Sequence, residues 1–540
     1  MPAFPAAPDV AVAATATGSP PVPLAGSDGR YSGAGITVTT TPAAAGLDIA
    51  VACPAGEISW VGLRWNDPKP EGTTYFGDAW ERSYGDLQWR GDQPERILPW
   101  YFVSAAPGAS AGWGVRVRPG AFCSWRADAA GTTLWLDLHS GGSPVRLGAR
   151  RLGTATVVRV EGDDPWTTLE TLVEAMCEDP LPSRDPVLGC NNWYYAYGEN
   201  FGPDQILRDA DTIVELAGDR IGGDSFTGDS FTGDRAPYCV VDAGWSDGGH
   251  APGGPWDSGT AGLFDDMPAL ARDIAGRGAR PGIWFRPAAL TSVRDESLLR
   301  AGPRPSRELP LDLSRSEVLA QVATDVHRLV GWGFTLLKHD FSTLDHFGQF
   351  GPGMTSRLTD AGWSPADNTR TNAEILLEFY RTIRAAAGGA VVLGCNTVGH
   401  LAAGLVDVQR IGDDTSGREW ERTRRMGINA LAFRLPQHRR FFTVDADCVP
   451  CTPQTPWERN REFGDLIART GSALFFSIDP GARTAGTDAD IRRIIGTLAD
   501  TAGVPAIRPA DWQATTTPRR WTATDGTDVS YAWDEPVPAG

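Results

Sequence analysis

Phe334-Thr-Leu-Leu-Lys-His-Asp-Phe341 is the stretch around which the predicted fold is built. Its apolar run, residues 334–337, is typical of a buried parallel strand, and Lys338 and Asp340 follow at the carboxyl end. Because strand side chains alternate, these two residues point the same way, and a lysine beside an aspartate favours the ionised carboxylate. The pair is therefore either a salt bridge at a strand end or a catalytic nucleophile with its cation.

Seven further apolar runs repeat this strand pattern along the chain. They cover residues 187–193, 238–242, 281–285, 390–395, 405–411, 440–444 and 473–478. Most are separated by segments with apolar residues at i, i+3, i+4 and i+7, such as 316–330 and 372–383, which indicates amphipathic helices. Eight such units predict an α/β fold, a (β/α)8 TIM barrel over residues 185–505, with its chemistry at the carboxyl ends of the strands.

The rest of the chain predicts smaller units on both sides of the barrel. Residues 1–30 are rich in Ala, Pro and Gly and predict a loose N-terminal arm. Short alternating runs with turns predict an antiparallel β-sandwich over 31–165, followed by a linking helix over 166–184. Residues 506–540 predict a short C-terminal β segment. A tandem Gly-Asp-Ser-Phe-Thr repeat at 223–232 interrupts the first barrel unit, and we attach no function to it.

Residues 75–89, inside the predicted sandwich, are unusually aromatic for a connection between strands. Such a segment is either an ordinary packed interface or a loop that reaches a neighbouring active site. The sequence leaves both interpretations open.

Composition excludes several classes of partner. The chain of 540 residues has 67 acidic and 49 basic residues, and this excess of negative charge argues against nucleic acid or an anionic membrane as partner. No run approaches about 18 apolar residues, and the N-terminus lacks the basic region of a signal peptide, so we expect a cytoplasmic protein. Only Lys69 and Lys338 are lysines, which indicates that Lys338 has a role that a planar guanidinium cannot fill.

The polar residues at the predicted strand ends point to sugar chemistry. They are rich in carboxylates and tryptophan, and they include no His cluster, phosphate loop or G-x-S-x-G motif. Cys448 and Cys451 form the one close cysteine pair, without a second pair to complete a zinc site, so we expect no metal and no cofactor. Two carboxylates facing each other among aromatic rings are the arrangement used in glycoside hydrolysis.

Several motifs carry a resemblance to a known family. They are Asp242-Ala-Gly-Trp245, Gly282-Ile-Trp-Phe285, Pro310-Leu-Asp-Leu-Ser314 with the later Leu-Leu-Lys-His-Asp340, Arg410-Ile-Gly-Asp-Asp-Thr415, and Val444-Asp-Ala-Asp-Cys448. In this order they resemble the α-galactosidases of glycoside hydrolase families 36 and 27. The resemblance covers roughly residues 185–480, and the sandwich in front of the barrel fits family 36.

The resemblance implies a retaining α-glycosidase that acts through a covalent glycosyl-enzyme. It implies Asp340 as the nucleophile and Asp414, rather than its neighbour Asp413, as the acid/base. Because the acid/base must hold a proton, we expect it in a less cationic and more desolvated setting than Asp340. The expected substrate-binding residues are Trp193, Asp242, Trp245, Trp284, Lys338, Cys395, Arg410 and Asp413.

Two positions depart from the family pattern and leave the sugar open. Ala243 stands where the family usually has a second acid, and Arg286 stands where many members have an acid. The first expectation is an α-galactoside, with an α-glucoside, an α-N-acetylgalactosaminide or a β-L-arabinopyranoside as alternatives. Transglycosylation by the same carboxylates is a further alternative, and a non-catalytic carbohydrate-binding barrel is a remote one. The partner in each case is an oligosaccharide or glycoside, and the sequence does not indicate the oligomeric state.

Overall fold

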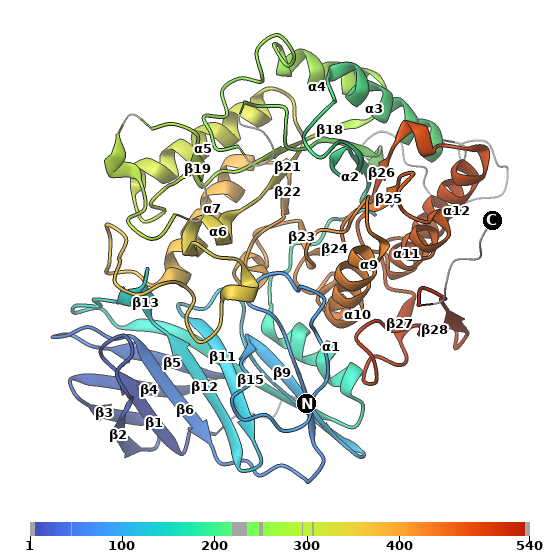
Figure 1. Ribbon diagram of the computed structural model, residues 1–540. Coiled ribbons are helices and arrows are strands. Elements are labelled where there is room, and N and C mark those ends of the chain that lie inside the picture. Colours follow the sequence, from blue (N-terminus) through green and yellow to red (C-terminus); the bar gives the residue numbers. More distant parts are fainter. Residues whose placement is uncertain are drawn as a thin grey trace.

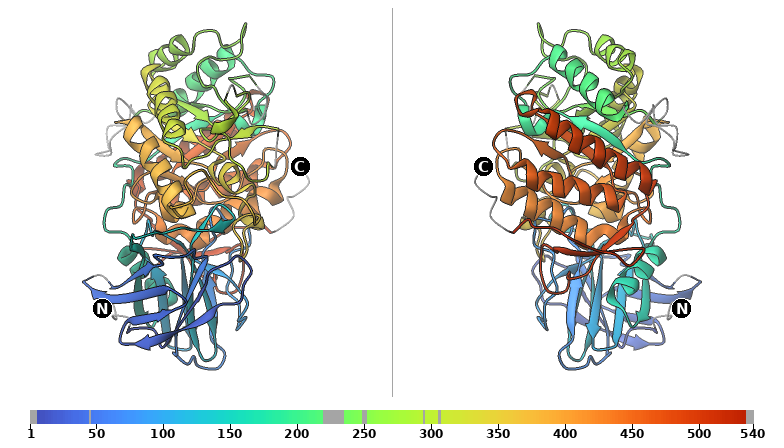
Figure 2. Two further views of the ribbon diagram at one scale, coloured as in Figure 1. Left: turned by 90° about the vertical axis from the view of Figure 1, so that its left-hand side faces the viewer. Right: turned by 90° about the vertical axis from the view of Figure 1, so that its right-hand side faces the viewer.

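The computed structural model describes residues 6–44, 46–218, 235–247, 252–293, 295–304 and 307–534. The N-terminal part forms a large antiparallel sheet, and the rest forms a curved parallel sheet with helices packed around it (Figure 1). The two further views show the antiparallel sheet at one end of the molecule and the helices of the parallel-sheet domain at the other (Figure 2). The Gly-Asp-Ser-Phe-Thr repeat at 223–232 lies outside the described residues.

The antiparallel sheet has thirteen strands in the order β7-β9-β10-β15-β5-β4-β3-β2-β1-β6-β12-β11-β8. Their bounds are β1 Val10–Ala14, β2 Val22–Ser27, β3 Arg30–Gly33, β4 Ile36–Ala43, β5 Gly46–Ala52, β6 Trp60–Trp65, β7 Thr74–Gly77, β8 Leu98–Pro99, β9 Tyr101–Ala106, β10 Ala109–Val115, β11 Phe122–Asp128, β12 Gly131–Asp137 and β15 Leu152–Gly162. Strands β13 (His139–Ser140) and β14 (Ser143–Pro144) form a separate pair. The sequence predicted a sandwich. The strands are antiparallel as predicted, and they follow one hydrogen-bonded order that curves back on itself, with Gly77 of β7 packed on the side chain of Leu98 in β8.

The prediction of a loose arm over residues 1–30 was wrong for the residues that the structure describes. Strand β1 pairs with both β2 and β6, and its alternate residues Ala11 and Ala13 are fully buried. Small side chains at these positions let β1 lie in the middle of the sheet. The alternation was missed because an Ala- and Pro-rich composition resembles that of a flexible segment.

The parallel sheet contains a strand in each of the eight segments that the sequence predicted, and a ninth strand over residues 449–451 that the sequence did not predict. The strands are β16 Leu188–Asn191, β17 Tyr238–Val241, β18 Arg280–Phe285, β21 Leu336–His339, β22 Val391–Gly394, β23 Val408–Arg410, β24 Thr443–Asp445, β25 Val449–Cys451 and β26 Leu474–Ile478. Their order is β24-β23-β22-β21-β18-β17-β16-β26-β25, and all pairs are parallel. A parallel bridge between Asp445 and Ala473 links β24 with the residue before β26, so the sheet curves back toward its own start.

Helices pack on both sheets: the first helix lies against β10 and β15 of the antiparallel sheet, and others lie against the parallel sheet. Their bounds are α1 Pro165–Met176, α2 Trp193–Ala196, α3 Pro203–Gly218, α4 Met267–Gly276, α5 Ser316–Gly331, α6 Ser342–Phe347, α7 Asn372–Ala387, α8 Gly399–Ala402, α9 Trp420–Thr423, α10 Asn429–Arg434, α11 Trp457–Thr470 and α12 Ala485–Thr501, with a π-helical turn at Arg424–Ile428. In α5, Val318, Val322 and Val326 are buried at helical spacing. Within the described ranges, no helix is both long enough and apolar enough to span a membrane.

Short strands complete the fold at two places. Strands β19 (Ala289–Leu290) and β20 (Leu309–Pro310) pair beside the parallel sheet. In the predicted C-terminal β segment, β28 (Arg520–Ala523) and β29 (Asp528–Ser530) form a hairpin, and β27 (Ile507–Pro509) adds a third strand.

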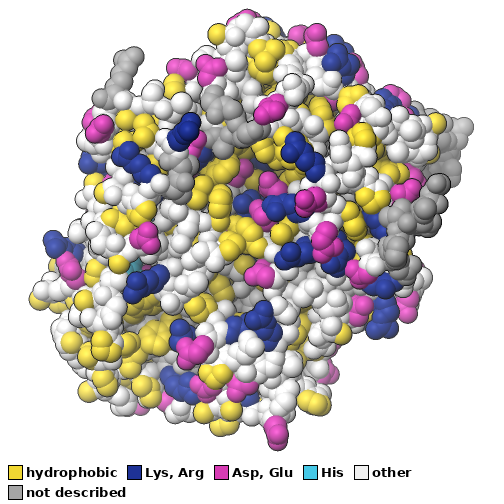
Figure 3. All heavy atoms as spheres, viewed as in Figure 1, with side chains coloured by type: hydrophobic (Ala, Val, Ile, Leu, Met, Phe, Trp, Pro, Cys, Tyr) yellow, Lys and Arg dark blue, Asp and Glu magenta, His cyan; other side chains and the backbone are white. Residues whose placement is uncertain are grey.

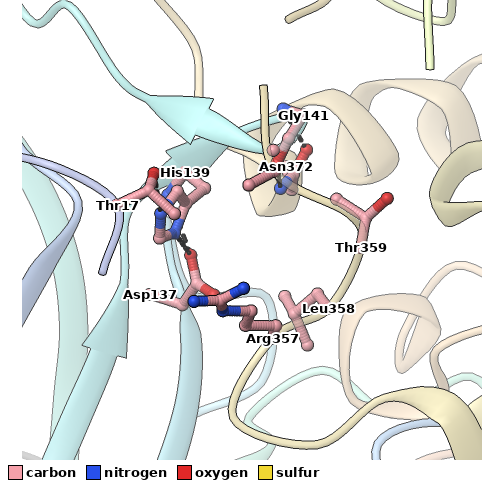
Figure 4. A pocket seen from close by; sticks show the side chains of 10 residues that line it. Thr17, Asp137, His139, Gly141, Arg357, Leu358, Thr359 and Asn372 are labelled. Atoms are coloured by element: carbon pink, nitrogen blue, oxygen red, sulfur yellow. Dashed lines mark hydrogen bonds and ion pairs between the residues drawn. The ribbon is translucent and has the colours of Figure 1, made fainter. Parts of the chain in front are cut away.

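The two domains meet in a polar interface near the start of α7. The backbone amide of Gly141 donates to Asn372 Oδ1 at 2.8 Å, and Asn372 Nδ2 donates back to the Gly141 carbonyl at 2.9 Å. Next to it, the His139 ring lies between Thr17 and Asp137, with its Nδ1 2.7 Å from the aspartate (Figure 4). The two bonds between Gly141 and Asn372 hold the antiparallel sheet domain against the start of α7. Residues 75–89 cross from that domain to the carboxyl ends of the parallel strands, where Ser83 pairs with the backbone of residues 411–413.

Candidate active site

Asp340 lies one residue beyond β21, where the chain turns out of the sheet. Phe341 has a φ of 61°, and α6 begins at the next residue. This turn directs the Phe341 amide to Asp340 Oδ1 at 2.7 Å, and the Trp284 indole donates to Oδ2 at 3.1 Å. A left-handed conformation at a bulky residue costs free energy and is often found at functional sites. The half-buried carboxylate therefore has one fixed donor on each oxygen.

The predicted pairing of Lys338 with Asp340 is corrected. Lys338 Nζ donates to Asp242 Oδ2 at 2.7 Å, and both side chains are buried. Burial alone would lower the pKa of Lys338, but the surrounding acidic groups, with Asp242 foremost among them, together raise that pKa, so the ammonium stays charged. Alternation failed as a guide because β21 ends at His339 and Asp340 already belongs to the turn, while the long lysine side chain reaches toward the end of β17.

Asp242 is the centre of a small buried network. Its Oδ2 also accepts from Asn191 Nδ2 at 2.5 Å, and its Oδ1 accepts from the Ala243 amide at 2.8 Å. Both oxygens are thus engaged by neighbours from β16, β17 and β21. A charged carboxylate that is buried and fully hydrogen-bonded holds its partners rigidly.

Because Lys338 is packed against Asp242, Lys338→Arg should impair activity nearly as much as Lys338→Ala. The guanidinium carries the same charge but is larger and planar, and the buried site accommodates a compact ammonium. Steady-state kinetics of both variants check this. Near-normal kinetics in Lys338→Arg, with Lys338→Ala impaired, would show that the charge alone matters.

The loop after β23 carries the second group of carboxylates. Arg410 is 1% exposed, and its guanidinium binds the Gly412 carbonyl, the Asp414 carboxylate and Asp447 Oδ1, the last at 2.9 Å. Asp447 in turn accepts from the Tyr194 hydroxyl and the Thr415 amide. Arg410 is therefore the fixed point from which Asp414 extends, and the Asp414 side chain keeps 38% of its surface exposed.

Arg82 reaches the same loop from the antiparallel sheet domain. Its guanidinium lies 3.0 Å from Asp413 Oδ1 and 3.7 Å from Asp414 Oδ1. The Ser83 amide donates to the Ile411 carbonyl at 2.9 Å, and the Asp413 amide donates to the Ser83 carbonyl at 2.8 Å. Residues 75–89 are thus both a packed interface and a loop that reaches the strand ends. Their aromatic composition was the signal in the sequence, but it could not single out Arg82.

The environment of Asp414 differs from the one expected for an acid/base. Burial alone would raise the pKa of Asp414, but the charges of Arg410, Arg82 and Lys338 outweigh it and lower that pKa to about 2. The expectation of a less cationic setting was therefore wrong. Asp413 is 13% exposed and is ion-paired with both Arg82 and Arg422, the latter at 2.6 Å.

The three tryptophans of the expected substrate site differ in position. Trp193 opens α2 and is half-buried next to the Tyr197 ring. Trp284 is 1% exposed, and its indole nitrogen donates a hydrogen bond to the Asp340 carboxylate. Trp245 is fully buried and donates to the Trp284 carbonyl at 2.8 Å, so its expected contact with substrate is corrected to support of Trp284 from behind.

Cys395, at the end of β22, lies among the charged groups of the site. Burial raises the pKa of its thiol, and the charges of Asp340, Arg410, Lys338 and Arg82 all act on it. Because electrostatic effects fall off with distance, these residues lie in one region of the molecule, although they come from β21 and the turn after it, from β23 and from the antiparallel sheet domain. In the space-filling view, basic and acidic side chains lie side by side near the centre of the face, bordered by hydrophobic ones (Figure 3).

Arg286 has a structural partner that the sequence did not reveal. Its guanidinium binds the buried Asp345 with Nε 2.9 Å from Oδ2 and Nη2 2.6 Å from Oδ1, and it lies 4.6 Å from the centre of the Phe341 ring. It therefore braces α6 and the turn that presents Asp340.

Asp445 is a further buried carboxylate near Arg410. Burial, helped by the charge of Asp447, raises the pKa of Asp445 to about 6.

Among the described residues, no cluster of three His, Cys, Asp or Glu side chains is arranged to hold a metal ion.

Comparison with solved structures identifies the class of fold. The chain has the fold of solved α-galactosidases, among them members of glycoside hydrolase family 36. No family model matches the sequence.

Three of these structures give the extent of the likeness. An α-galactosidase from Thermus thermophilus, in complex with p-nitrophenyl α-D-galactopyranoside, is 19% identical with a TM-score of 0.61, over 92% of this chain and 97% of that chain. The galactosidase domain of the α-galactosidase-sucrose kinase AgaSK is 15% identical with a TM-score of 0.62, over 92% and 72%. A variant of AgaA from Geobacillus stearothermophilus, in complex with raffinose, is 13% identical with a TM-score of 0.60, over 91% and 71%. At these identities the likeness is one of fold.

Proposed function

We propose that this protein is a retaining α-glycosidase that cleaves a terminal α-linked sugar, and that its preferred substrate is an α-galactoside. The observation that carries the proposal is the arrangement of Asp340 and Asp414. Asp340, after β21, is held by two neutral donors, and Asp414, after β23, is held by arginines. The charges of Lys338, Arg410 and Arg82 act on Asp414, and the same three charges act together with that of Asp340 on the Cys395 thiol. The fold shared with α-galactosidases supports the reaction class.

The proposed architecture is a (β/α)8 barrel behind the antiparallel sheet. The eight predicted strands, their parallel order and the bridge that links Asp445 with Ala473 support a closed barrel. On this assignment Asp340 follows the fourth strand and Asp414 the sixth. The two carboxylates then approach the barrel mouth from different sides, as a two-carboxylate mechanism requires.

In the proposed reaction Asp340 attacks the anomeric carbon while Asp414 protonates the departing glycosidic oxygen. The bond from the anomeric carbon to that oxygen breaks, and an ester bond to Asp340 forms. Asp414, now ionised, removes a proton from water, and the resulting attack releases the sugar and restores Asp340. Two inversions at the anomeric carbon give net retention. The arginines beside Asp414 favour its ionised form, which is the form required in the second step.

The remaining residues are proposed to bind the sugar. Lys338 and Asp242 form a rigid charged pair beside the site, with Trp193, Cys395 and Asp413 as further candidates. The solved structures with a similar fold include complexes with p-nitrophenyl α-galactoside, stachyose and raffinose. This favours, as substrate, an α-galactoside or an oligosaccharide that ends in one. Loss of a charged partner at position 243 is worth about 1.5–3 kcal/mol per hydrogen bond to a sugar hydroxyl, so the alternative sugars remain part of the test.

A panel of p-nitrophenyl glycosides tests this proposal. It contains the α- and β-anomers of galactose, glucose, N-acetylgalactosamine and arabinopyranose. We expect release of p-nitrophenol from the α-galactoside. Preference for another sugar with the same carboxylate dependence would change the substrate and keep the mechanism. No turnover of any member, combined with sugar binding, would favour the carbohydrate-binding alternative.

A further inference from the structure

Arg82 connects the antiparallel sheet domain to the two carboxylates that follow β23. Each terminal nitrogen of its guanidinium faces one of these carboxylates. Nη2 lies 3.0 Å from Asp413 Oδ1, and Nη1 lies 3.7 Å from Asp414 Oδ1. The backbone of Ser83 pairs with the same loop on both sides. The cation and the loop that it serves are therefore held together as one unit.

The position of the Arg82 guanidinium is itself fixed by its surroundings. Its Nε donates to the Tyr84 hydroxyl at 3.2 Å, and its central carbon lies 5.4 Å from the centre of the Phe350 ring. Tyr84 donates to Glu81, and Glu81 accepts from the Gly351 amide at 2.7 Å and from Asn396 Nδ2 at 3.1 Å. The Arg82 side chain is 8% exposed. A cation that is buried and braced in this way is preorganised for a task at the site.

The charged and titratable groups around Asp414 come from several elements. Arg410 lies on β23, Lys338 on β21, Tyr194 on α2 and Arg82 on the segment 75–89, while the neighbouring Asp413 is paired with Arg422 of α9. Arg410 divides its charge between Asp414 and Asp447. Arg82 is thus a second cation in direct range of the Asp414 carboxylate, and it comes from the other domain.

We infer that Arg82 is a positioning residue for the acid/base, because it orients the Asp414 carboxylate and sets the pH range over which that group holds its proton. This inference rests on the proposed function and extends it to the antiparallel sheet domain. Arg82 favours the ionised form of Asp414, which is the base of the second step. Docking of that domain is therefore part of building the active site.

The sign of the expected effect follows from the charge. Removing a cation near a carboxylate raises its pKa, here by about one unit or more, because one nearby arginine lowers the pKa of an aspartate by roughly 1–3 units. The general acid then keeps its proton to higher pH. In a variant that lacks the charge, the descending limb of the plot of kcat/KM against pH should therefore move to higher pH.

The decisive variants are Arg82→Gln, which keeps length and a donor but loses the charge, and Arg82→Lys, which keeps the charge. The first readout is carbon NMR of the full chain with labelled aspartate carboxyls, with the Asp414 signal assigned through Asp414→Asn. We expect the Asp414 titration to shift upward by about one unit or more in Arg82→Gln and far less in Arg82→Lys. Arg422→Ala is the matched control, since it removes a cation that pairs with Asp413, and it should move the Asp414 titration much less.

The second readout is the pH profile of kcat/KM with p-nitrophenyl α-galactoside. An upward shift of its descending limb in Arg82→Gln, with partial restoration in Arg82→Lys, supports the inference. An unchanged Asp414 titration in a folded Arg82→Gln protein overturns it, whatever the activity. The NMR titration needs no turnover, so failure of the proposed glycosidase function is seen separately, as absence of activity in the unaltered protein.

Discussion

Replacing Asp340 with alanine is expected to lower kcat/KM for an activated α-galactoside by on the order of 10⁴-fold or more, because no group remains to form the glycosyl-enzyme. The fold should persist. Asp340 is half-buried at the end of β21, and its two donors, the Trp284 indole and the Phe341 amide, lie at the site and not in the core. Steady-state kinetics, together with circular dichroism of the purified variant, check both parts.

Asp360→Ala provides the control for this experiment, since Asp360 is an exposed aspartate in the loop before α7. It should leave both kinetics and folding unchanged. Retention of more than a few per cent of activity in Asp340→Ala would remove Asp340 from the role of nucleophile. The alternative assignment would then be sought among the other carboxylates, beginning with Asp445, whose pKa is raised to about 6 by burial.

Replacing Asp414 with alanine should give a different signature. Cleavage of an oligosaccharide needs a proton donor and should slow by about 10²–10⁴-fold, whereas p-nitrophenol leaves without one, so formation of the glycosyl-enzyme from that substrate should suffer less. The intermediate should then accumulate, because no base activates water. Added azide needs no base and should restore turnover, with the α-galactosyl azide as product.

Asp413→Ala is the matched control for Asp414→Ala. Its carboxylate is ion-paired with Arg82 and Arg422, so its loss should disturb the loop without abolishing proton transfer. Azide rescue in Asp413→Ala, and none in Asp414→Ala, would show that the acid/base is the other neighbour. The 38% exposure of the Asp414 side chain, against 13% for Asp413, supports the present assignment.

The parallel strands could be read from the sequence because their signal is local. A strand buried on both faces is a continuous apolar run, and residues such as 334–337 and 473–478 show it without any knowledge of their neighbours. Strand β1 escaped notice because its buried residues are alanines. The curved single sheet could not be foreseen either, since turns and alternation predict strands but not their order.

The candidate site was predictable only as far as the strand ends. The positions of Asp340 and of the loop at 411–415 followed from the strand pattern, but their ion-pair partners did not. Lys338 pairs with Asp242 because the chain leaves the strand before Asp340, and this depends on the left-handed turn at Phe341. Arg82 comes from the other domain, and no periodicity in the sequence records such a contact.

Arg286 stands where many members of the resembled family have an acid, and the structure gives a physical reason for the arginine. The guanidinium is 1% exposed and is satisfied by Asp345 and by the face of the Phe341 ring. Because removal of one partner of a buried ion pair costs roughly 3–5 kcal/mol, this arginine is explained by stability of the α6 turn.

Two carboxylates acting in turn at the anomeric carbon give retention, and proton NMR of the first-formed product measures this outcome. The p-nitrophenyl α-galactoside, or whichever α-glycoside the panel identifies, is mixed with enzyme at high concentration, and the anomeric signals are followed before the free sugar equilibrates. Attack by Asp340 and the later attack by water each invert the anomeric carbon, so we expect the α-anomer to form first. Initial release of the β-anomer would contradict it, because that product requires direct displacement by water.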